Sequence, residues 1–330
     1  MNNTIILKPI NGLGDKIINL LGAAVYCHYK NYHLKAVFNE NCMYYHFNSH
    51  NYYDLSLFKF TNLSVFNETK EINHNDLENA LQFHNPDTIV SITPYSIYQK
   101  LKNEGLGISF EEVSNMFIKF AKNIEPNECI SNYIPIGIEN CYGVHLRKTD
   151  KIKTNPDIRH EMTPDENIML LNKVIIMIEE MIEIEDNISF FISSEDNEHK
   201  QQFVDSINKI ANNKNKTINL ITIPENIPEN IKSKLNYECI LDMFCLSKCK
   251  SIIQGVKYSA FSVIASLLGN EKLINLSQYL DNNELCIIHL WNSVIQINDN
   301  KNFYENKYLN QINKYKEIGV FYGDIYISNL

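Results

Sequence analysis

In the second half of the chain, short apolar runs alternate with longer segments of helical periodicity. The apolar runs predict strands, and the periodic segments between them predict helices. The predicted strands cover residues 141–146, 188–192, 217–221, 251–254 and 272–276, and the predicted helices cover residues 164–184, 198–212, 237–247 and 259–268. Strands that alternate with helices of this length indicate a parallel, doubly wound sheet, so the pattern predicts an α/β fold.

The start of the chain shows the same alternation. Two strands are predicted, over residues 4–7 and 34–38, with a turn at residues 11–14 and a helix over residues 16–29 between them. Asp15 stands where it can cap that helix. Farther on, a strand is predicted over residues 88–92 and helices over residues 96–102 and 110–124, whereas residues 42–66 show no regular period.

Proline and glycine interrupt the pattern between residues 125 and 139, at Pro126, Pro135 and Gly137. Such a segment is typical of a link between domains. We therefore expect a first domain over residues 1–137 and a second over residues 138–300. A helical tail over residues 301–330 is expected to pack back on the body.

Composition narrows the class of protein. With 330 residues and 44% hydrophobic residues, the chain can build the cores of two domains. A net charge of −9 offers no basic surface for nucleic acid or an anionic membrane. No apolar stretch approaches the roughly 20 residues of a membrane-spanning helix, and the eight cysteines include no Cys-x-x-Cys pair. We expect a cytoplasmic protein with reduced thiols, no nucleic-acid partner and no integral membrane segment.

Only two of the 30 cationic residues are arginines, Arg147 and Arg159. Arg147 follows a predicted strand, where open α/β sheets bind ligands. His145 lies two residues earlier, so both side chains point the same way on an extended segment. The arginine fork can bind two phosphate oxygens at once, which suits a diphosphate. Asp150 can fix the guanidinium or accept hydrogen bonds in the turn. An ordinary strand end with a surface ion pair is the alternative.

The turn with Gly12 and Gly14 is a second candidate site. Two glycines after a strand let the backbone approach a ligand, and the helix that follows presents its N-terminus to an anion. Ile17 occupies the place of the third glycine in a dinucleotide-binding fingerprint. The turn can equally be a tight connection capped by Asp15. Asp15 can also serve as a general base for an acceptor hydroxyl.

Two more polar segments follow predicted strands. Ser194 and Glu195 lie after the strand at residues 188–192, and the Glu195 carboxylate can accept hydrogen bonds from the N1 and N2 edge of guanine. The same segment can be a helix N-cap, and both can hold at once. Ser259 and Ser262, at the start of a predicted helix, can hold phosphate oxygens, with Lys257 adding a charge. A plain strand–loop–helix connection is the alternative for this second segment.

Taken together and in this order, these segments resemble the GT-B fucosyltransferase superfamily. The superfamily includes α-1,6-fucosyltransferases, nodulation fucosyltransferases and protein O-fucosyltransferases. Its His-x-Arg-x-x-Asp element is matched by His145, Arg147 and Asp150, and residues 242–249 are similar to its Asp-x-x-x-Leu-Ser-x-Cys helix. The resemblance implies two Rossmann-like domains with parallel sheets and an active site in the cleft between them.

The resemblance also implies an activity, the transfer of fucose from GDP-fucose to a glycan hydroxyl by inverting displacement. The nucleotide sugar is then a donor substrate, and no cofactor is expected. His145 and Glu195 would contact guanine, Arg147 the β-phosphate and Ser259 the pyrophosphate. The chain has no Asp-x-Asp motif, which builds metal-bridged sites for nucleotide sugars, so we expect no metal. Donor sugar, acceptor, linkage and oligomeric state stay open.

The expected catalytic residues are Arg147, Asp15 and Asp150. At Asn155 the α-1,6 enzymes carry a glutamate, so the general base stays open among Asp15, Asp157 and Glu161, in that order. Glu195 also stands where an aspartate is common in the superfamily. Two other readings remain. One is a nucleotide-dependent oxidoreductase that uses the glycine turn, and the other is a non-catalytic relative that binds GDP or a glycan.

Overall fold

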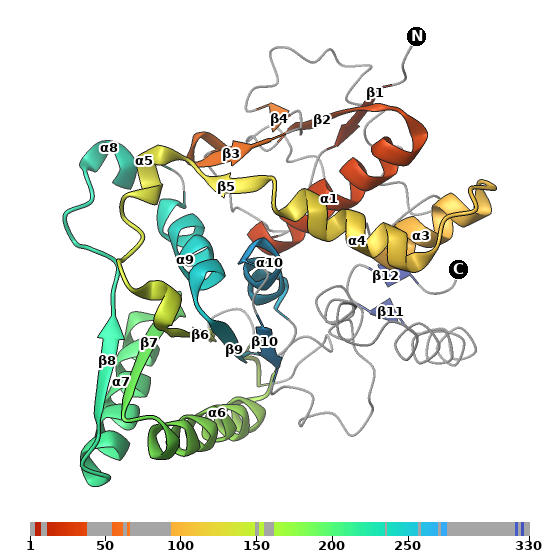
Figure 1. The fold of residues 1–330 in the computed structure, drawn as a ribbon. Coiled ribbons are helices and arrows are strands. Elements are labelled where there is room, and N and C mark those ends of the chain that lie inside the picture. Colours follow the sequence, from red (N-terminus) through yellow and green to blue (C-terminus); the bar gives the residue numbers. More distant parts are fainter. Residues whose placement is uncertain are drawn as a thin grey trace. The chain divides into compact units, whose positions relative to one another are not determined.

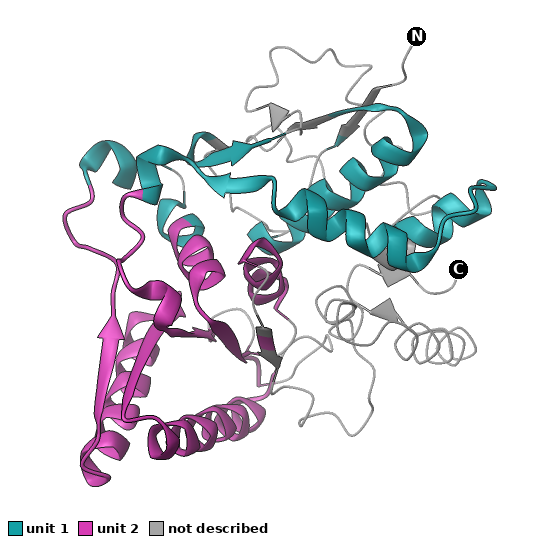
Figure 2. Cartoon of the chain, in the orientation of Figure 1, with its two compact units in different colours: residues 1–131, 228–240, 286–330 teal, residues 132–227, 241–285 magenta. Residues whose placement is uncertain are grey.

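The structure is a computed structural model with two compact units (Figure 1). It describes residues 4–7, 12–37, 55–61, 65–66, 94–148, 152–154, 162–234, 236–256, 259–269, 272–275, 321–322 and 325–326. The first unit comprises residues 1–131, 228–240 and 286–330, and the second comprises residues 132–227 and 241–285 (Figure 2). Residues 228–240 thus group with the first unit, although they lie within the second predicted domain. The predicted domain bounds stay a prediction.

The second unit is built on a five-stranded sheet. Its elements are β6 (Tyr142–Leu146), α6 (Pro164–Ile184), β7 (Asn187–Ser194), α7 (Asn197–Asn213), β8 (Thr217–Ile221), α9 (Tyr237–Lys248), β9 (Ser251–Gly255), α10 (Ala260–Gly269) and β10 (Lys272–Asn275), preceded by a 3-10 helix, η4 (Ile138–Asn140). The first turn of α9, residues 237–240, groups with the first unit. The strand order is β10-β9-β6-β7-β8, and every neighbouring pair is parallel. The strand order reverses between β6 and β9, as in doubly wound nucleotide-binding folds. The predicted α/β class with a parallel sheet is confirmed.

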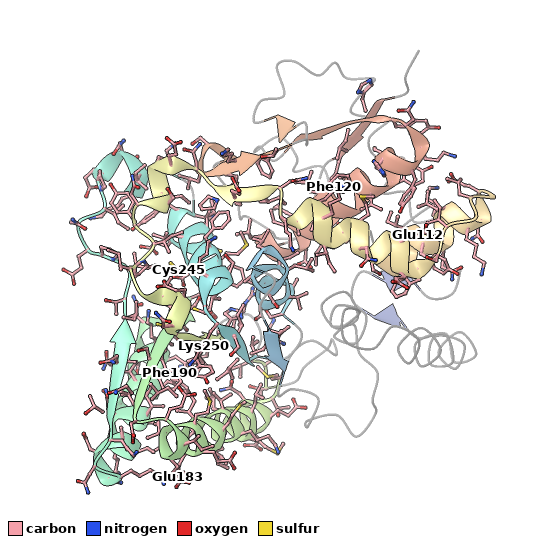
Figure 3. The ribbon with its side chains drawn as sticks, in the orientation of Figure 1. Glu112, Phe120, Glu183, Phe190, Cys245 and Lys250 are labelled. Atoms are coloured by element: carbon pink, nitrogen blue, oxygen red, sulfur yellow. The ribbon has the colours of Figure 1, made fainter. Side chains whose placement is uncertain are left out.

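The central strand β6 carries different side chains on its two faces. Val144 and Leu146 lie in a buried apolar core with residues of α6 and α7, and Phe190 of β7 belongs to the same core (Figure 3). On the opposite face, a methyl carbon added at Gly143 would lie 2.8 Å from Leu246 Cδ2 of α9. Because that distance is below van der Waals contact, only glycine lets α9 pack so closely on this strand.

Side-chain caps explain why several helices begin where they do. At α6, the Thr163 hydroxyl accepts a hydrogen bond from the Glu166 amide at 3.1 Å, and the Thr163 amide donates to the Glu166 carboxylate at 2.8 Å. Pro164 occupies the first turn, where it has no amide hydrogen to leave unpaired. These signals are local in the sequence, and the predicted bounds of this helix, 164–184, agree with the structure.

The first unit contains a three-stranded parallel sheet in the order β1-β2-β4 and an antiparallel pair, β3 with β5. Its elements are β1 (Thr4–Leu7), α1 (Leu13–Lys30), β2 (His33–Val37), a 3-10 turn η2 (Leu55–Leu57), β3 (Phe58–Phe60), β4 (Val65–Phe66), α3 (Pro94–Asn103), α4 (Phe110–Ala121), β5 (Ile124–Pro126), α5 (Glu128–Ser131), α8 (Glu229–Lys232) and the antiparallel pair β11 (Phe321–Tyr322) and β12 (Ile325–Tyr326). Helix α1 is held to the end of α3 by Glu104, which accepts hydrogen bonds from the Tyr26 hydroxyl and pairs with Lys30 and Lys100.

Two sequence predictions for the first unit are wrong. Helix α1 begins at Leu13 with Gly12 as its N-cap, so Asp15 lies inside the first turn and is not the N-cap residue. The helix predicted over residues 110–124 ends at Ala121, and Ile124 begins strand β5. The strand predicted at residues 88–92 lies outside the described residues. Of the tail predicted as helical over residues 301–330, the structure describes only Phe321–Tyr322 and Ile325–Tyr326, and these form the antiparallel strands β11 and β12 and not a helix. No helix in the described part of the chain is long and apolar enough to span a bilayer.

Candidate functional site

The candidate site lies at the carboxyl edge of the sheet in the second unit. Strand β6 ends at Leu146, directly before Arg147, and β7 ends at Ser194, directly before Glu195. Strand β9 ends at Gly255. Because all these strands are parallel, their carboxyl ends meet at one edge of the sheet. The strand order reverses between β6 and β9, and ligands of open α/β sheets bind at such a point.

His145 connects β6 to the start of α10. Its side chain is buried, and Nδ1 lies 2.6 Å from the Ser262 hydroxyl and 3.5 Å from the Ser259 hydroxyl. The ring centroid lies 4.9 Å from that of Phe261. The structure therefore brings the predicted site residue His145 together with two others, Ser259 and Ser262, which lie more than 100 positions later in the sequence.

The protonation state of His145 follows from its surroundings. Burial, together with the nearby guanidinium of Arg147, lowers the pKa of His145 to about 3. The imidazole is therefore neutral at pH 7, with one nitrogen able to donate a hydrogen bond and the other able to accept one. The histidine therefore adds no positive charge to this strand end, whereas Arg147, whose side chain is half-buried, does.

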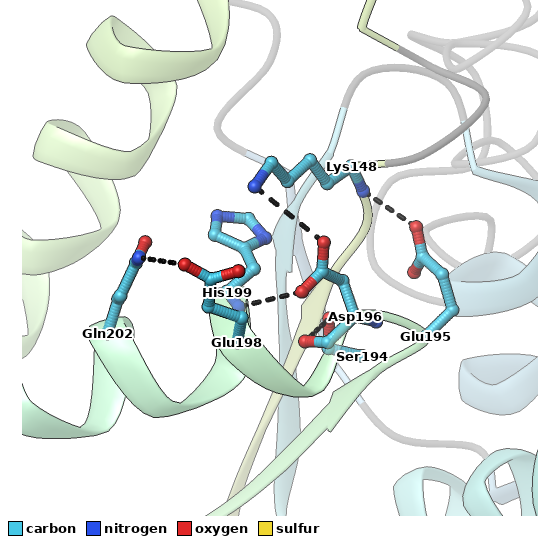
Figure 4. Close-up of polar contacts among 7 residues, drawn as sticks. All are labelled: Lys148, Ser194, Glu195, Asp196, Glu198, His199 and Gln202. Carbon is cyan, nitrogen blue, oxygen red and sulfur yellow. Dashed lines mark hydrogen bonds and ion pairs between the residues drawn. The ribbon is translucent and has the colours of Figure 1, made fainter.

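The Glu195 segment is tied to the residue that follows Arg147 (Figure 4). The Lys148 amide donates a hydrogen bond to Glu195 Oε1 at 2.7 Å, and Lys148 Nζ lies 3.7 Å from Asp196 Oδ2. Asp196 is the N-cap of α7, because its carboxylate accepts a hydrogen bond from the His199 amide at 2.8 Å. That bond is the main cause that lowers the pKa of Asp196. The N-cap reading of this segment is confirmed, and the guanine contact of Glu195 stays a prediction.

Three polar side chains of this region were not assigned a role from the sequence. Ser193 donates a hydrogen bond to Asp242 Oδ2 of α9 at 2.6 Å, on the face of the sheet opposite the α6 and α7 core. Gln254 at the end of β9 and His199 at the start of α7 are buried. One feature of the sequence could have indicated a role for Gln254. It is a polar residue that directly follows the apolar run Ile252–Ile253, and a polar residue is unusual in a buried strand.

The predicted glycine turn belongs to the first unit. Gly14 is buried, and Gly12 and Asp15 are partly exposed at the start of α1. The Lys16 amide donates to the Gly12 carbonyl at 2.9 Å, which closes the first helical turn. Their binding and catalytic roles stay predictions. Several predicted or considered site residues lie outside the described residues, namely Asp150, Asn155, Asp157, Glu161 and Lys257.

Comparison with known proteins gives structural likeness only. No protein-family model and no curated protein sequence matches the chain. It is similar to the solved structure of NodZ α-1,6-fucosyltransferase soaked with GDP-fucose, at 15% identity, over 81% of this chain and 93% of that chain, with a TM-score of 0.49. Fucosyltransferase NodZ from Bradyrhizobium gives the same values. POFUT1 in complex with GDP-fucose is 11% identical over 83% of this chain and 97% of that chain, with a TM-score of 0.44. Likeness at this level assigns no activity to the chain.

Proposed function

We propose that the chain is a metal-independent glycosyltransferase that transfers fucose from GDP-fucose to a glycan hydroxyl by inverting displacement. The observation that carries the proposal is the arrangement at the carboxyl edge of β6. There Arg147 follows the buried, neutral His145, and His145 contacts Ser259 and Ser262 at the start of α10. The His-x-Arg-x-x-Asp resemblance of the sequence supports the same reading.

Arg147 is the residue that acts on the leaving group. When the bond between the sugar and the diphosphate breaks, negative charge grows on the departing oxygen. A guanidinium stays protonated at any physiological pH and can bind two phosphate oxygens in its fork. Electrostatic stabilisation of this kind is worth about 10²–10³ in rate for each donor. Arg147 would thereby supply the charge that a divalent cation supplies in other transferases.

The start of α10 supplies the second set of phosphate contacts. The first amides of a helix have no partner within the helix, and they carry the positive end of the helix dipole. Ser259 directly precedes α10, and Ser262 lies in its first turn. The two hydroxyls and the helix amides can therefore bind diphosphate oxygens. His145, neutral and in contact with both hydroxyls, fixes their orientation without adding a charge.

The chemical step moves one bond pair and one proton. The acceptor hydroxyl oxygen forms a bond to the anomeric carbon as the bond from that carbon to the diphosphate oxygen breaks, which inverts the configuration. GDP leaves with the electron pair, and the hydroxyl proton passes to a general base. The base is proposed among Asp15, Asp157 and Glu161.

Binding of nucleotide sugars tests the proposal. We expect GDP-sugars to raise the melting temperature of the chain, whereas UDP-, dTDP- and CMP-sugars leave it unchanged. A ligand at about 100 times its Kd stabilises the folded state by about 2.7 kcal/mol, which gives a measurable shift. Stabilisation by NAD instead of GDP would favour an oxidoreductase. GDP binding without release of sugar from GDP-fucose would favour a non-catalytic relative.

A further inference from the structure

Buried polar atoms without a hydrogen-bond partner gather near one edge of the second unit. Within the described part of the chain, such atoms belong to Asn167, His199, Ser251 and Gln254. Asn167 and His199 lie near the starts of α6 and α7, and Gln254 lies near the end of β9. Three of these four residues are therefore at the carboxyl edge of the sheet. Buried polar groups are nearly always paired, so an orphaned group at a ligand-binding edge suggests that a ligand supplies the partner.

Gln254 is the most constrained of these residues. Its side chain is fully buried, and its Nε2 donates a hydrogen bond to the Val256 carbonyl at 2.8 Å. That bond fixes the orientation of the amide, because a carbonyl can accept only from the nitrogen end. Oε1 is thereby left as an acceptor, and it has no partner among the described residues. Because Val256 follows the last residue of β9, the amide reaches toward the carboxyl edge of the sheet.

The sheet register places Gln254 beside the candidate site. Gln254 of β9 and Ser193 of β7 are the paired neighbours of His145 on its two sides. Paired residues in neighbouring strands project to the same face of a sheet. The three side chains therefore form a polar row across the strands. In this row His145 contacts Ser262, and Ser193 bonds to Asp242, whereas the acceptor of Gln254 has no donor in the part of the chain that the structure describes.

We propose that Gln254 binds the nucleoside part of the donor, with Oε1 accepting a hydrogen bond from an N–H or O–H group of the ligand. This inference rests on the proposed function. Ionised diphosphate oxygens only accept hydrogen bonds, so they cannot satisfy Oε1. The matching groups of a guanine nucleotide are the N1–H and 2-amino groups of the base and the hydroxyls of the ribose. Gln254 would then contribute to the choice of nucleotide and not to the chemistry on the sugar.

Titration calorimetry with Gln254→Met tests the inference. Methionine keeps the length of the side chain and removes the acceptor, together with the amide N–H that bonds to the Val256 carbonyl. We expect GDP to bind about tenfold more weakly, as loss of a hydrogen bond to a buried group predicts. Ser251→Ala is the matched control, because Ser251 lies at the opposite end of the same strand and its buried hydroxyl is also unpartnered among the described residues. We expect its GDP affinity to stay within about twofold of the wild type, well below the loss at position 254.

Nucleotide analogues identify the group that Gln254 binds. IDP lacks the 2-amino group, 1-methyl-GDP lacks the N1–H, and 2′- and 3′-deoxy-GDP each lack one hydroxyl. The analogue without the relevant group should bind the wild type as weakly as GDP binds Gln254→Met, and the variant should show no further loss with it. If the methionine variant does not fold, Gln254→Asn replaces it. The asparagine side chain is one methylene shorter, so its acceptor lies farther from the ligand, and its GDP affinity is interpreted in the same way.

The outcomes separate this inference from the proposed function. Wild-type GDP affinity in a folded Gln254→Met variant, with unchanged discrimination among the analogues, overturns the role of Gln254 and leaves the proposed function intact. A wild-type chain that binds no guanine nucleotide at all contradicts the proposed function itself, and the role of Gln254 falls with it.

Discussion

Acidification should destabilise the second unit through His145. In the folded chain the pKa of His145 is about 3, because the ring is buried next to Arg147. An imidazole in the unfolded chain titrates near pH ~6.5. Below that pH the imidazole of the unfolded chain binds a proton, whereas the buried imidazole of the folded chain stays neutral. The free energy of unfolding therefore falls as the pH drops, and it stops falling only near pH 3. The slope approaches about 1.4 kcal/mol per pH unit. Between pH ~7.5 and ~5 this single group costs about 2 kcal/mol.

Urea unfolding of the wild type and of His145→Asn measures the effect. The asparagine amide can still bond to the Ser262 hydroxyl, but it does not titrate. Subtracting the two unfolding free energies at each pH removes the contributions of other groups, among them His199, whose pKa is also lowered by burial. We expect the advantage of the wild type over the variant to shrink by about 2 kcal/mol between pH ~7.5 and ~5. A difference that does not change with pH would refute the buried, neutral state of His145.

Two further substitutions test the packing and the capping of the second unit. Gly143→Ala should lower the free energy of unfolding by about 1–3 kcal/mol, because the new methyl group meets α9 at 2.8 Å. Gly107→Ala is the control, because a methyl group added there meets nothing within 4 Å. We expect it to change the free energy of unfolding little in the same denaturant titration. Thr163→Ala should cost about 1 kcal/mol, because it removes the capping hydroxyl of α6, and equal unfolding midpoints for variant and wild type would contradict this.

The elements of the second unit were largely predictable from the sequence. The predicted bounds of β8 and α6 agree with the structure, and most other elements differ by one or two residues. Parallel strands that are buried on both faces form continuous apolar runs, and the helix between two such runs begins at a recognisable cap. The polar residues that follow the predicted strands also predicted a ligand site at the carboxyl ends of these strands, and that site stays a prediction.

What the sequence did not predict depends on contacts between distant residues. The prediction that Asp15 caps α1 was wrong. Residue preference alone does not show at which residue a helix begins, and the N-cap is Gly12, three residues before Asp15. The contact between His145 and Ser262 joins positions 117 residues apart, and only the order of β9 and β6 in the sheet creates it. The buried amide of Gln254 likewise follows from the neighbours that the fold places around it, which the local sequence does not encode.

Turnover of GDP-fucose by Arg147→Lys tests most directly the claim that a guanidinium at the end of β6 stabilises the leaving diphosphate. Lysine keeps the charge but cannot bind two oxygens in a fork. With a panel of oligosaccharide acceptors, we expect release of GDP from GDP-fucose to slow by about 10²–10³ while the melting temperature stays unchanged. Arg159→Lys makes the same exchange at the chain's other arginine, outside the strand motif, and should retain most of the activity. Wild-type turnover in Arg147→Lys would contradict the account.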